Sequence, residues 1–390
     1  MNLGEEIGIF FKPIDFDIVP KKGELSENLF YNSKDHGFPD IPKKSLVLFS
    51  INEPRLNHGI LNFINTSNQI RKNLYCLSSF NKYVKLYDLG SLEPGNTIQD
   101  TFFAIKQTFK KLILNKCTII LIGNTKELSL PVYYAYKELE EFVNIVEIDS
   151  SISHLDFSSE DNPFYLSKII NENPCYLFNF SNIGYQSYYV NPSQTDLMEK
   201  LFFESYRLGW VRQNILETEP IIRSGNFLVF NVSSIRFSDL PLENKNNPNG
   251  FYGEEACQLS RYAGLSQNLN IFGLFDLFPW NIQPYIGIEL SAQIIWYFIE
   301  GFVNRTIEIP NDSSQFIKYH ITPENYGSEI IFYKNIKNDK WWMEIPFSNN
   351  LNQKRFNRFN LIPCSIADYQ TACSNDIPER WWKTFQKLNV

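Results

Sequence analysis

Short apolar segments alternate with segments of helical periodicity from about residue 45 to residue 304. The apolar segments predict buried strands, and they are 45–51, 84–90, 117–123, 143–149, 175–181, 227–232 and 270–277. Between them, apolar residues recur at helical spacing in 61–80, 99–115, 129–141, 160–172, 194–206, 251–264 and 289–303. Apolar strands that alternate with helices predict βαβ units around a parallel sheet. The predicted fold class is therefore α/β, with three αβα layers and a mostly parallel sheet of about eight strands.

The pattern changes near residue 305, and this change sets the predicted domain boundaries. The segment 329–347 predicts a β-hairpin, and the stretch after it is polar and basic. The chain then continues into a helical segment and an aromatic, cationic tail. We predict an α/β domain over 45–304, with an N-terminal extension, 1–44, and a C-terminal extension, 305–390, packed against it.

The charge and hydropathy of the chain argue against nucleic acid as a partner and against insertion into a membrane. The net charge is −7 and Lys and Arg do not cluster, so we expect no nucleic-acid-binding surface. The stretch 1–16 lacks the basic start and the long apolar segment of a signal peptide. No window approaches the roughly 18 uninterrupted apolar residues of a membrane span. The sequence therefore predicts a cytoplasmic protein that is not integral to a membrane.

The cysteines and histidines are few and scattered. The six cysteines include no CxxC pair, which is typical of free, mostly buried thiols in a reducing compartment. A bridge between Cys364 and Cys373 is the alternative. No two of the four histidines have the spacing of the HExxH motif, so the sequence excludes that class of zinc site.

Ligands of a parallel sheet bind beyond the carboxyl ends of its strands. The informative residues therefore follow the predicted strands directly, at 124–127, 149–156, 181–187, 231–236 and 276–280. The strand in "FLVFNVSSI" delivers Asn231 and Ser233 to this edge. These are an amide and a hydroxyl, whereas sites of this design usually carry carboxylates.

Five segments at these strand ends resemble the ureohydrolase family, which comprises arginase, agmatinase and formimidoylglutamase. They are "LIGNTKELS", "VEIDSSIS", "VFNVSSI", "NPNGFYGEEA" and "FGLFDLFP", where the family has GGDHS, DAHxD, FDVDxxDP, a PGG turn before a helix with EA, and ExNP. The resemblance covers roughly 45–304, and the tail resembles C-terminally extended members from Bacteroidota. It implies an arginase-like fold and a binuclear manganese site that activates a hydroxide.

The resemblance places six metal-ligand positions in this chain. They are Lys126 for the histidine of GGDH, Asp149, Ser151 and Ser153 for the three ligands of DAHxD, and Asn231 and Ser233 for the two aspartates of DVD. Only Asp149 keeps the family residue. Asn and Ser bind Mn²⁺ weakly and an ammonium group repels it, so we expect no metal cofactor here. Asp276 falls on the family's guanidinium-contacting glutamate.

Several interpretations of these residues stay open. Lys126 is either a solvated loop lysine or a cation that pairs with Asp149 or Asp276 in place of the metal. Asp276 is either a remaining acid of the pocket or a cap for the following turn. A displaced metal site built from Asp149, His154 and Asp156 is a further alternative. The serines and the asparagine are more typical of structural hydrogen bonding than of ligands or nucleophiles.

Tryptophans occur as adjacent pairs at two places in the C-terminal extension. The pairs are Trp341–Trp342 and Trp381–Trp382, and Arg380 precedes the second pair. They are either core contacts of the extension or an interface, since Trp and Arg are enriched at binding hot spots.

Three functions are consistent with the sequence. The first, which we expect, is a pseudoenzyme that binds another protein or a second copy of itself as a scaffold subunit. The second is a module that binds a small cationic or amidine metabolite through Asp149 and Asp276. The third is an active hydrolase of a guanidino or formimino compound with an altered or displaced metal site, for which manganese would be expected.

Overall fold

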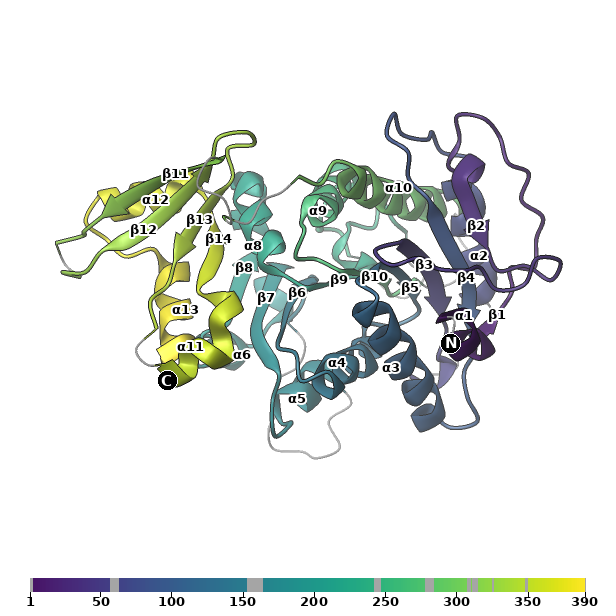
Figure 1. The fold of residues 1–390 in the computed structure, drawn as a ribbon, viewed down its shortest axis with the longest axis horizontal. Coiled ribbons are helices and arrows are strands. Elements are labelled where there is room, and N and C mark those ends of the chain that lie inside the picture. The colour runs from purple at the N-terminus through teal and green to yellow at the C-terminus, as the bar shows by residue number, and fades with distance from the viewer. Residues whose placement is uncertain are drawn as a thin grey trace.

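The computed structural model describes residues 3–56, 63–152, 164–241, 247–277, 284–306, 310, 315–324, 326–347 and 350–389. A large sheet with helices on both faces forms the main body (Figure 1). A smaller antiparallel sheet is built from the last part of the chain and lies at one end of the molecule.

Ten strands form the main sheet. Nine of them follow one another in the order β1 (Phe11–Lys12), β4 (Leu86–Leu92), β3 (Leu46–Ile51), β5 (Thr118–Gly123), β10 (Ile271–Phe275), β9 (Phe227–Asn231), β6 (Val143–Ile148), β7 (Leu177–Tyr185) and β8 (Glu204–Arg207). The tenth, β2 (Leu29–Tyr31), pairs with β4. Among the strand pairs of this sheet that the structure describes, only β1–β4 is antiparallel. The eight strands from β3 to β10 confirm the predicted mostly parallel sheet of about eight strands.

Alternate residues of the central strands belong to two different cores. In β5, Ile119 and Leu121 join one hydrophobic cluster, and Ile120 and Ile122 join the other. The first cluster is covered by α3 (Ile98–Leu114), α4 (Ser129–Glu138), α5 (Tyr165–Ile170) and α6 (Pro192–Lys200). The second is covered by α2 (Phe63–Tyr75), α7 (Leu208–Gln213), α8 (Thr218–Ser224), α9 (Gly253–Leu265) and α10 (Pro284–Val303). This is the predicted αβα arrangement.

Helix α10 has the length and apolar composition of a membrane span over Tyr285–Val303, and among the described helices it is the only one that does. Its residues Ile294, Ile295 and Phe298 are fully buried in the second core. In this structure α10 therefore serves as a core helix.

The sequence prediction of one helix over 194–206 is wrong. Helix α6 ends at Lys200, and Phe202 then takes a left-handed backbone conformation with φ of 56°. The chain continues as β8, which pairs with β7. Glu204 in β8 is buried and accepts a hydrogen bond from Ser181 Oγ at 2.5 Å. This tertiary pairing overrides the local helical periodicity.

The smaller sheet contains β11 (Phe316–Ile321), β12 (Ile330–Asn335), β13 (Trp341–Glu344) and β14 (Leu361–Cys364), in that order. The predicted hairpin is formed by β12 and β13. Helices α11 (Asn350–Phe356), α12 (Ile366–Cys373) and α13 (Glu379–Asn389) complete this region. All six cysteines lie in described parts of the chain and are free thiols, so the alternative Cys364–Cys373 bridge is absent.

The structure distinguishes between the two alternatives for the tryptophan pairs, core contact and exposed surface. Trp341, Trp342 and Trp381 are at most 7% exposed, because they pack inside the folded chain. The side chain of Arg380 is 13% exposed, donates to the backbone oxygen of Pro363 at 3.2 Å and lies 3.7 Å from Glu204. Neighbouring residues of a helix face different directions, so Trp382, unlike Trp381, is 42% exposed. Of these five residues, Trp382 alone offers a partner substantial surface.

Candidate functional site

Neighbouring strands bring the predicted site residues together at the carboxyl edge of the main sheet. Lys126 follows β5, Asp149 follows β6, Asn231 ends β9 and Asp276 follows β10. Thr125 Oγ1 accepts a hydrogen bond from the backbone N–H of Glu127 and thereby caps the short turn η4 (Lys126–Leu128). This cap fixes the backbone that carries Lys126.

Asp149 is at the centre of the cluster and is 1% exposed. Lys126 Nζ lies 2.6 Å from Asp149 Oδ2, which confirms the predicted ion pair between them. Asn231 Nδ2 donates to the same oxygen at 3.0 Å, and the backbone N–H of Ser151 donates to Oδ1 at 3.3 Å. Both carboxylate oxygens of Asp149 therefore accept hydrogen bonds from the chain itself.

The amide of Asn231 explains why this strand end carries no carboxylate. Asn231 Oδ1 accepts the backbone N–H of Ser233 at 3.1 Å and so caps the turn η7 (Val232–Ser234). This bond leaves Nδ2 to face Asp149 as a donor. An aspartate at 231 could make the cap but would place a second negative charge against Asp149. The asparagine thus satisfies the turn and the buried carboxylate together.

Glu147 is a second buried carboxylate of the cluster, and it was not among the residues predicted from the sequence. Glu147 Oε1 lies 3.0 Å from Lys126 Nζ and accepts a hydrogen bond from the Tyr165 hydroxyl at 3.1 Å. Asn182 Nδ2 donates to Glu147 Oε2 at 3.2 Å. Residues two apart in a strand face the same side, so the charge inside "VNIVEID" could have pointed to this partner of Asp149.

The charges of the cluster stabilise one another. Burial alone would lower the pKa of Lys126, but the negative charges of Asp149 and Glu147 outweigh burial and raise this pKa. Burial raises the pKa of Glu147, and the charge of Lys126 opposes that shift. The ammonium group therefore stays charged between two carboxylates.

Glu127 adds a third carboxyl group beside the cluster. Its Oε2 accepts the backbone N–H of Tyr165 at 2.6 Å, at the first residue of α5. Burial raises the pKa of Glu127 to about 7, although the charge of Lys126 and the bond from Tyr165 act in the opposite direction. This group therefore changes its charge near neutral pH.

We expect a Glu127→Gln variant to be less sensitive to pH than the wild type. An acid whose folded pKa is raised stabilises the fold below its unfolded pKa, here 4.5, and that stability is lost as pH rises through about 7. Across this window the wild type should lose on the order of 2 kcal/mol relative to the variant. Urea denaturation at about pH 4.5 and about pH 7.5 measures the difference. If the difference in the free energy of unfolding between the two proteins is the same at both pH values, the assignment is contradicted.

The remaining predicted residues have structural contacts or lie outside the described chain. Ser151 accepts a hydrogen bond from Asn182 through its backbone oxygen. Asp276 has a left-handed backbone with φ of 61°, a conformation that Asp tolerates, and its charge helps to raise the pKa of Glu127. Ser153, His154 and Asp156 lie outside the described residues, so the displaced metal site stays a prediction.

The described part of the cluster does not fit a binuclear metal centre. Two divalent ions close together need several carboxylates and imidazoles around them. Here the oxygens of Asp149 already face an ammonium group and an amide N–H, which a metal would have to displace. Within the described ranges, no three His, Cys, Asp or Glu side chains are grouped so as to hold a metal ion. The residues form an internal ion-pair network instead of a ligand set.

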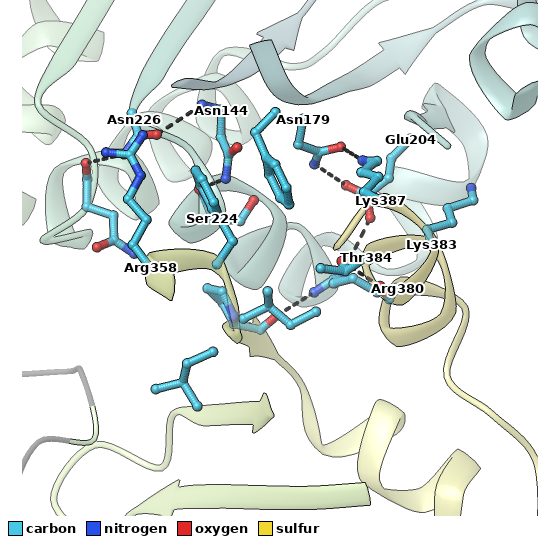
Figure 2. A pocket seen from close by; sticks show the side chains of 16 residues that line it. Asn144, Asn179, Glu204, Ser224, Asn226, Arg358, Arg380, Lys383, Thr384 and Lys387 are labelled. Carbon is cyan, nitrogen blue, oxygen red and sulfur yellow. Dashed lines mark hydrogen bonds and ion pairs between the residues drawn. The ribbon is translucent and has the colours of Figure 1, made fainter. Parts of the chain in front are cut away.

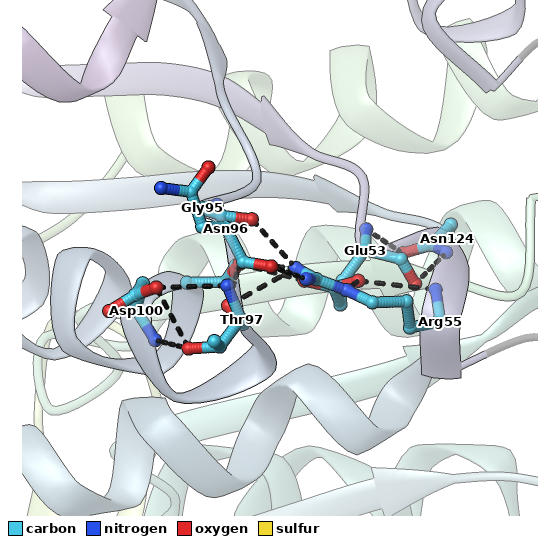
Figure 3. A network of polar contacts seen from close by, with 8 residues as sticks. Glu53, Arg55, Gly95, Asn96, Thr97, Asp100 and Asn124 are labelled. Carbon is cyan, nitrogen blue, oxygen red and sulfur yellow. Dashed lines mark hydrogen bonds and ion pairs between the residues drawn. The ribbon is translucent and has the colours of Figure 1, made fainter.

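A partly exposed ion pair between Arg55 and the buried Glu53 holds the neighbouring loops in place. Arg55 Nε and Nη2 donate to the two oxygens of Glu53 at 2.6 and 2.5 Å (Figure 3). Arg55 also donates to the backbone oxygens of 95–97, before α3. Asn124 exchanges two hydrogen bonds with the backbone of Glu53, at 3.0 and 3.1 Å. These contacts tie the end of β3 to the loop that carries Lys126.

The fold is similar to that of three solved hydrolases. A formiminoglutamase from Trypanosoma cruzi, solved with Mn²⁺, has a TM-score of 0.59 and 17% identity over 67% of this chain and 95% of its own. The formimidoylglutamase from Bacillus subtilis has a TM-score of 0.63 and 14% identity over 77% of this chain and 98% of its own. The agmatine ureohydrolase of Thermoplasma volcanium has a TM-score of 0.54 and 13% identity over 66% and 90%.

Sequence comparison adds no relative to these structures. No protein-family model matches the chain, and the search of curated proteins gives no match. The likeness therefore concerns the course of the backbone. At this sequence identity, the chemistry of the site does not follow from it. On this evidence the chain has the ureohydrolase fold, the fold of the arginase superfamily.

Proposed function

We propose that this chain is a pseudoenzyme, a protein of ureohydrolase fold that does not carry out metal-dependent hydrolysis. The observation that carries the proposal is the position of Lys126 Nζ, 2.6 Å from Asp149 and 3.0 Å from Glu147. This ammonium group supplies the positive charge that the buried carboxylates require. Without a metal, no hydroxide forms near neutral pH, since the pKa of free water is about 15.7.

Purified protein supplied with Mn²⁺ should therefore show no urea release from arginine or agmatine and no hydrolysis of formiminoglutamate. Elemental analysis of the same preparation should find far less than one manganese per chain. A formiminoglutamase assayed in parallel is the positive control. Turnover near the rate of an ordinary enzyme, about 10 s⁻¹, together with bound manganese would overturn the proposal.

The role that we propose in place of hydrolysis is binding of another protein. Asp149 already binds an ammonium group of its own chain, which argues against recognition of a cationic metabolite by this carboxylate. Support for protein binding comes from what we call the tyrosine–arginine surface, next to the carboxyl ends of β7 and β8. It consists of Tyr188, Arg207, Trp210, Arg212 and Tyr252.

The tyrosine–arginine surface is exposed at four of its five residues, namely Tyr188, Arg207, Trp210 and Tyr252. Tyr188, Arg207 and Arg212 line one shallow depression, and the side chain of Tyr188 is 62% exposed. The guanidinium group of Arg212 lies 4.3 Å from the ring centre of Tyr252. Tyr, Trp and Arg are enriched at binding hot spots. Arg212 already pairs with Glu255 at 3.5 Å, so it is the exposed Arg207 that favours a partner with an acidic surface.

A double variant, Tyr188→Ala with Arg207→Glu, should weaken this association at least about tenfold. Sedimentation velocity at rising concentration tests a second copy as the partner, and co-purification from the native cell tests another protein. Phe103→Ala is the matched control, because Phe103 is a 54% exposed aromatic residue on α3. Equal binding by the double variant and the control would contradict the surface assignment.

A further inference from the structure

A cavity of about 230 Å³ lies at the amino ends of strands of the main sheet. The Lys126 cluster lies at the opposite, carboxyl ends. Residues at the amino ends of three strands line one side, namely Asn144 of β6, Asn179 of β7 and Glu204 of β8. The other side is formed by β14, α13 and the turn η9 (Asn357–Phe359) (Figure 2). The C-terminal region therefore completes this cavity.

The lining of the cavity carries an excess of positive charge. Its basic and acidic side chains are Arg358, Arg380, Lys383, Lys387 and Glu204. Two of the basic groups have acidic partners outside the lining. Lys383 Nζ lies 2.7 Å from Glu379, and Arg358 lies 3.9 Å from Glu141. Inside the cavity, Arg380 and Lys387 therefore share the single carboxylate of Glu204, and Asp368, outside the lining, adds negative charge near Arg380.

The carboxylate of Glu204 has other donors and does not satisfy Arg380. Glu204 Oε2 accepts from Ser181 Oγ at 2.5 Å and from Asn179 Nδ2 at 3.3 Å. Arg380 Nε lies 3.7 Å from Glu204 Oε1. This buried N–H group has no hydrogen-bond partner within the described structure. Asn144 Oδ1, also buried and on the cavity wall, likewise lacks a donor there.

Lys387 is short of compensating negative charge. Its Nζ donates to Asn179 Oδ1, a neutral acceptor. Burial lowers the pKa of Lys387 to about 7; Glu204 opposes this shift and Lys383 adds to it. Near neutral pH, Lys387 is therefore uncharged in a fraction of the molecules. A nearby anion would favour its charged form.

We propose that this cavity binds a small oxyanion, a phosphate or carboxylate group, between Arg380 and Lys387. The unpaired N–H of Arg380 and the ammonium group of Lys387 are charge-assisted donors, which bind oxyanions strongly. The acceptor on Asn144 favours a ligand that also carries a hydroxyl group. Hydrogen phosphate and a hydroxycarboxylate such as malate both meet these conditions. The site is separate from the Lys126 cluster, so the inference goes beyond the proposed function.

Calorimetric titration of the full chain with inorganic phosphate and with malate tests the proposal. The wild type should bind at least one of them, and Lys387→Met should weaken that binding at least about tenfold. Lys354→Met is the matched control, because Lys354 lies exposed on α11 of the same region and does not line the cavity. Binding of phosphate only, or of malate only, identifies the source of the oxyanion.

Proton uptake gives an independent measurement. At about pH 8, malate binding should draw a proton onto Lys387, and the variant should lose this uptake. The charged groups that face Lys387 are Glu204, Arg380 and Lys383, with Arg358 across the cavity. Titrations in two buffers of different ionisation enthalpy measure the uptake.

Two results would overturn the proposal. One is that the wild type binds neither anion at about 10 mM. The dissociation constant would then be too high for a physiologically useful affinity. The other is equal weakening of binding in Lys387→Met and Lys354→Met. If Lys387→Met does not fold, Lys387→Gln provides the same comparison, because glutamine removes the charge and keeps a donor for Asn179 Oδ1.

Discussion

Replacing Lys126 with methionine should lower the free energy of unfolding by about 3–5 kcal/mol. The variant leaves Asp149 and Glu147, both almost fully buried, without the cation that lies 2.6 and 3.0 Å from them. The amide of Asn231 still donates to Asp149, but it cannot neutralise two carboxylates. Chemical denaturation at about pH 7 measures the loss.

A lysine in an exposed ion pair is the matched control for this variant. Lys12 pairs with Glu93, and its side chain is 64% exposed, so Lys12→Met should cost about 1 kcal/mol or less. The loss in Lys126→Met should also shrink on acidification, because protonated carboxyl groups need no cation. Equal stability of Lys126→Met and the wild type would show that the ammonium group does not replace the metal charge.

Combining Lys126→His with Asn231→Asp should create manganese-dependent stability that the wild type lacks. The double variant removes the ammonium group and adds an imidazole and a carboxylate beside Asp149 and Glu147. The apoprotein then carries excess buried negative charge, which a divalent cation relieves. If the dissociation constant is about 10 μM, about 1 mM Mn²⁺ should stabilise the fold by about 2.7 kcal/mol.

Two comparisons separate a metal site from a general effect of the salt. Lys126→Met alone removes the ammonium group without adding ligands, so it should gain much less from Mn²⁺ than the double variant. Mg²⁺ should stabilise the double variant less than Mn²⁺, because imidazole is a poor ligand for Mg²⁺. Equal stabilisation of the wild type and the double variant by Mn²⁺ would contradict the proposal that the Lys126 ammonium group takes the place of a metal ion.

Together these experiments test how one substitution changes the chemistry of a fold. The Lys126–Asp149 pair, with Glu147 and Asn231, forms a closed network at these strand ends. The anion-binding proposal concerns the opposite edge of the sheet and does not depend on this result. The proposal on hydrolytic activity and the proposal on anion binding are therefore tested independently of each other.

The sequence by itself determined the α/β architecture and the chemistry of the side chains at the strand ends. Runs of apolar residues, such as the one ending at Gly123, must be buried on both faces, and this requirement predicts a parallel sheet between helices. The identity of a side chain also determines its charge. Lys126, Asn231 and Ser233 could therefore be recognised as poor metal ligands before their positions were known.

Only the tertiary structure decided which groups meet and which are exposed. Glu147 became a partner of Lys126 because the loop after β5 reaches across the ends of β10 and β9 to β6, a relation that local periodicity does not contain. The burial of Trp381 and the exposure of Trp382 depend on which face of α13 packs against the smaller sheet. The cavity near Lys387 joins residues about 200 positions apart, because burial and electrostatics depend on neighbours in space rather than in sequence.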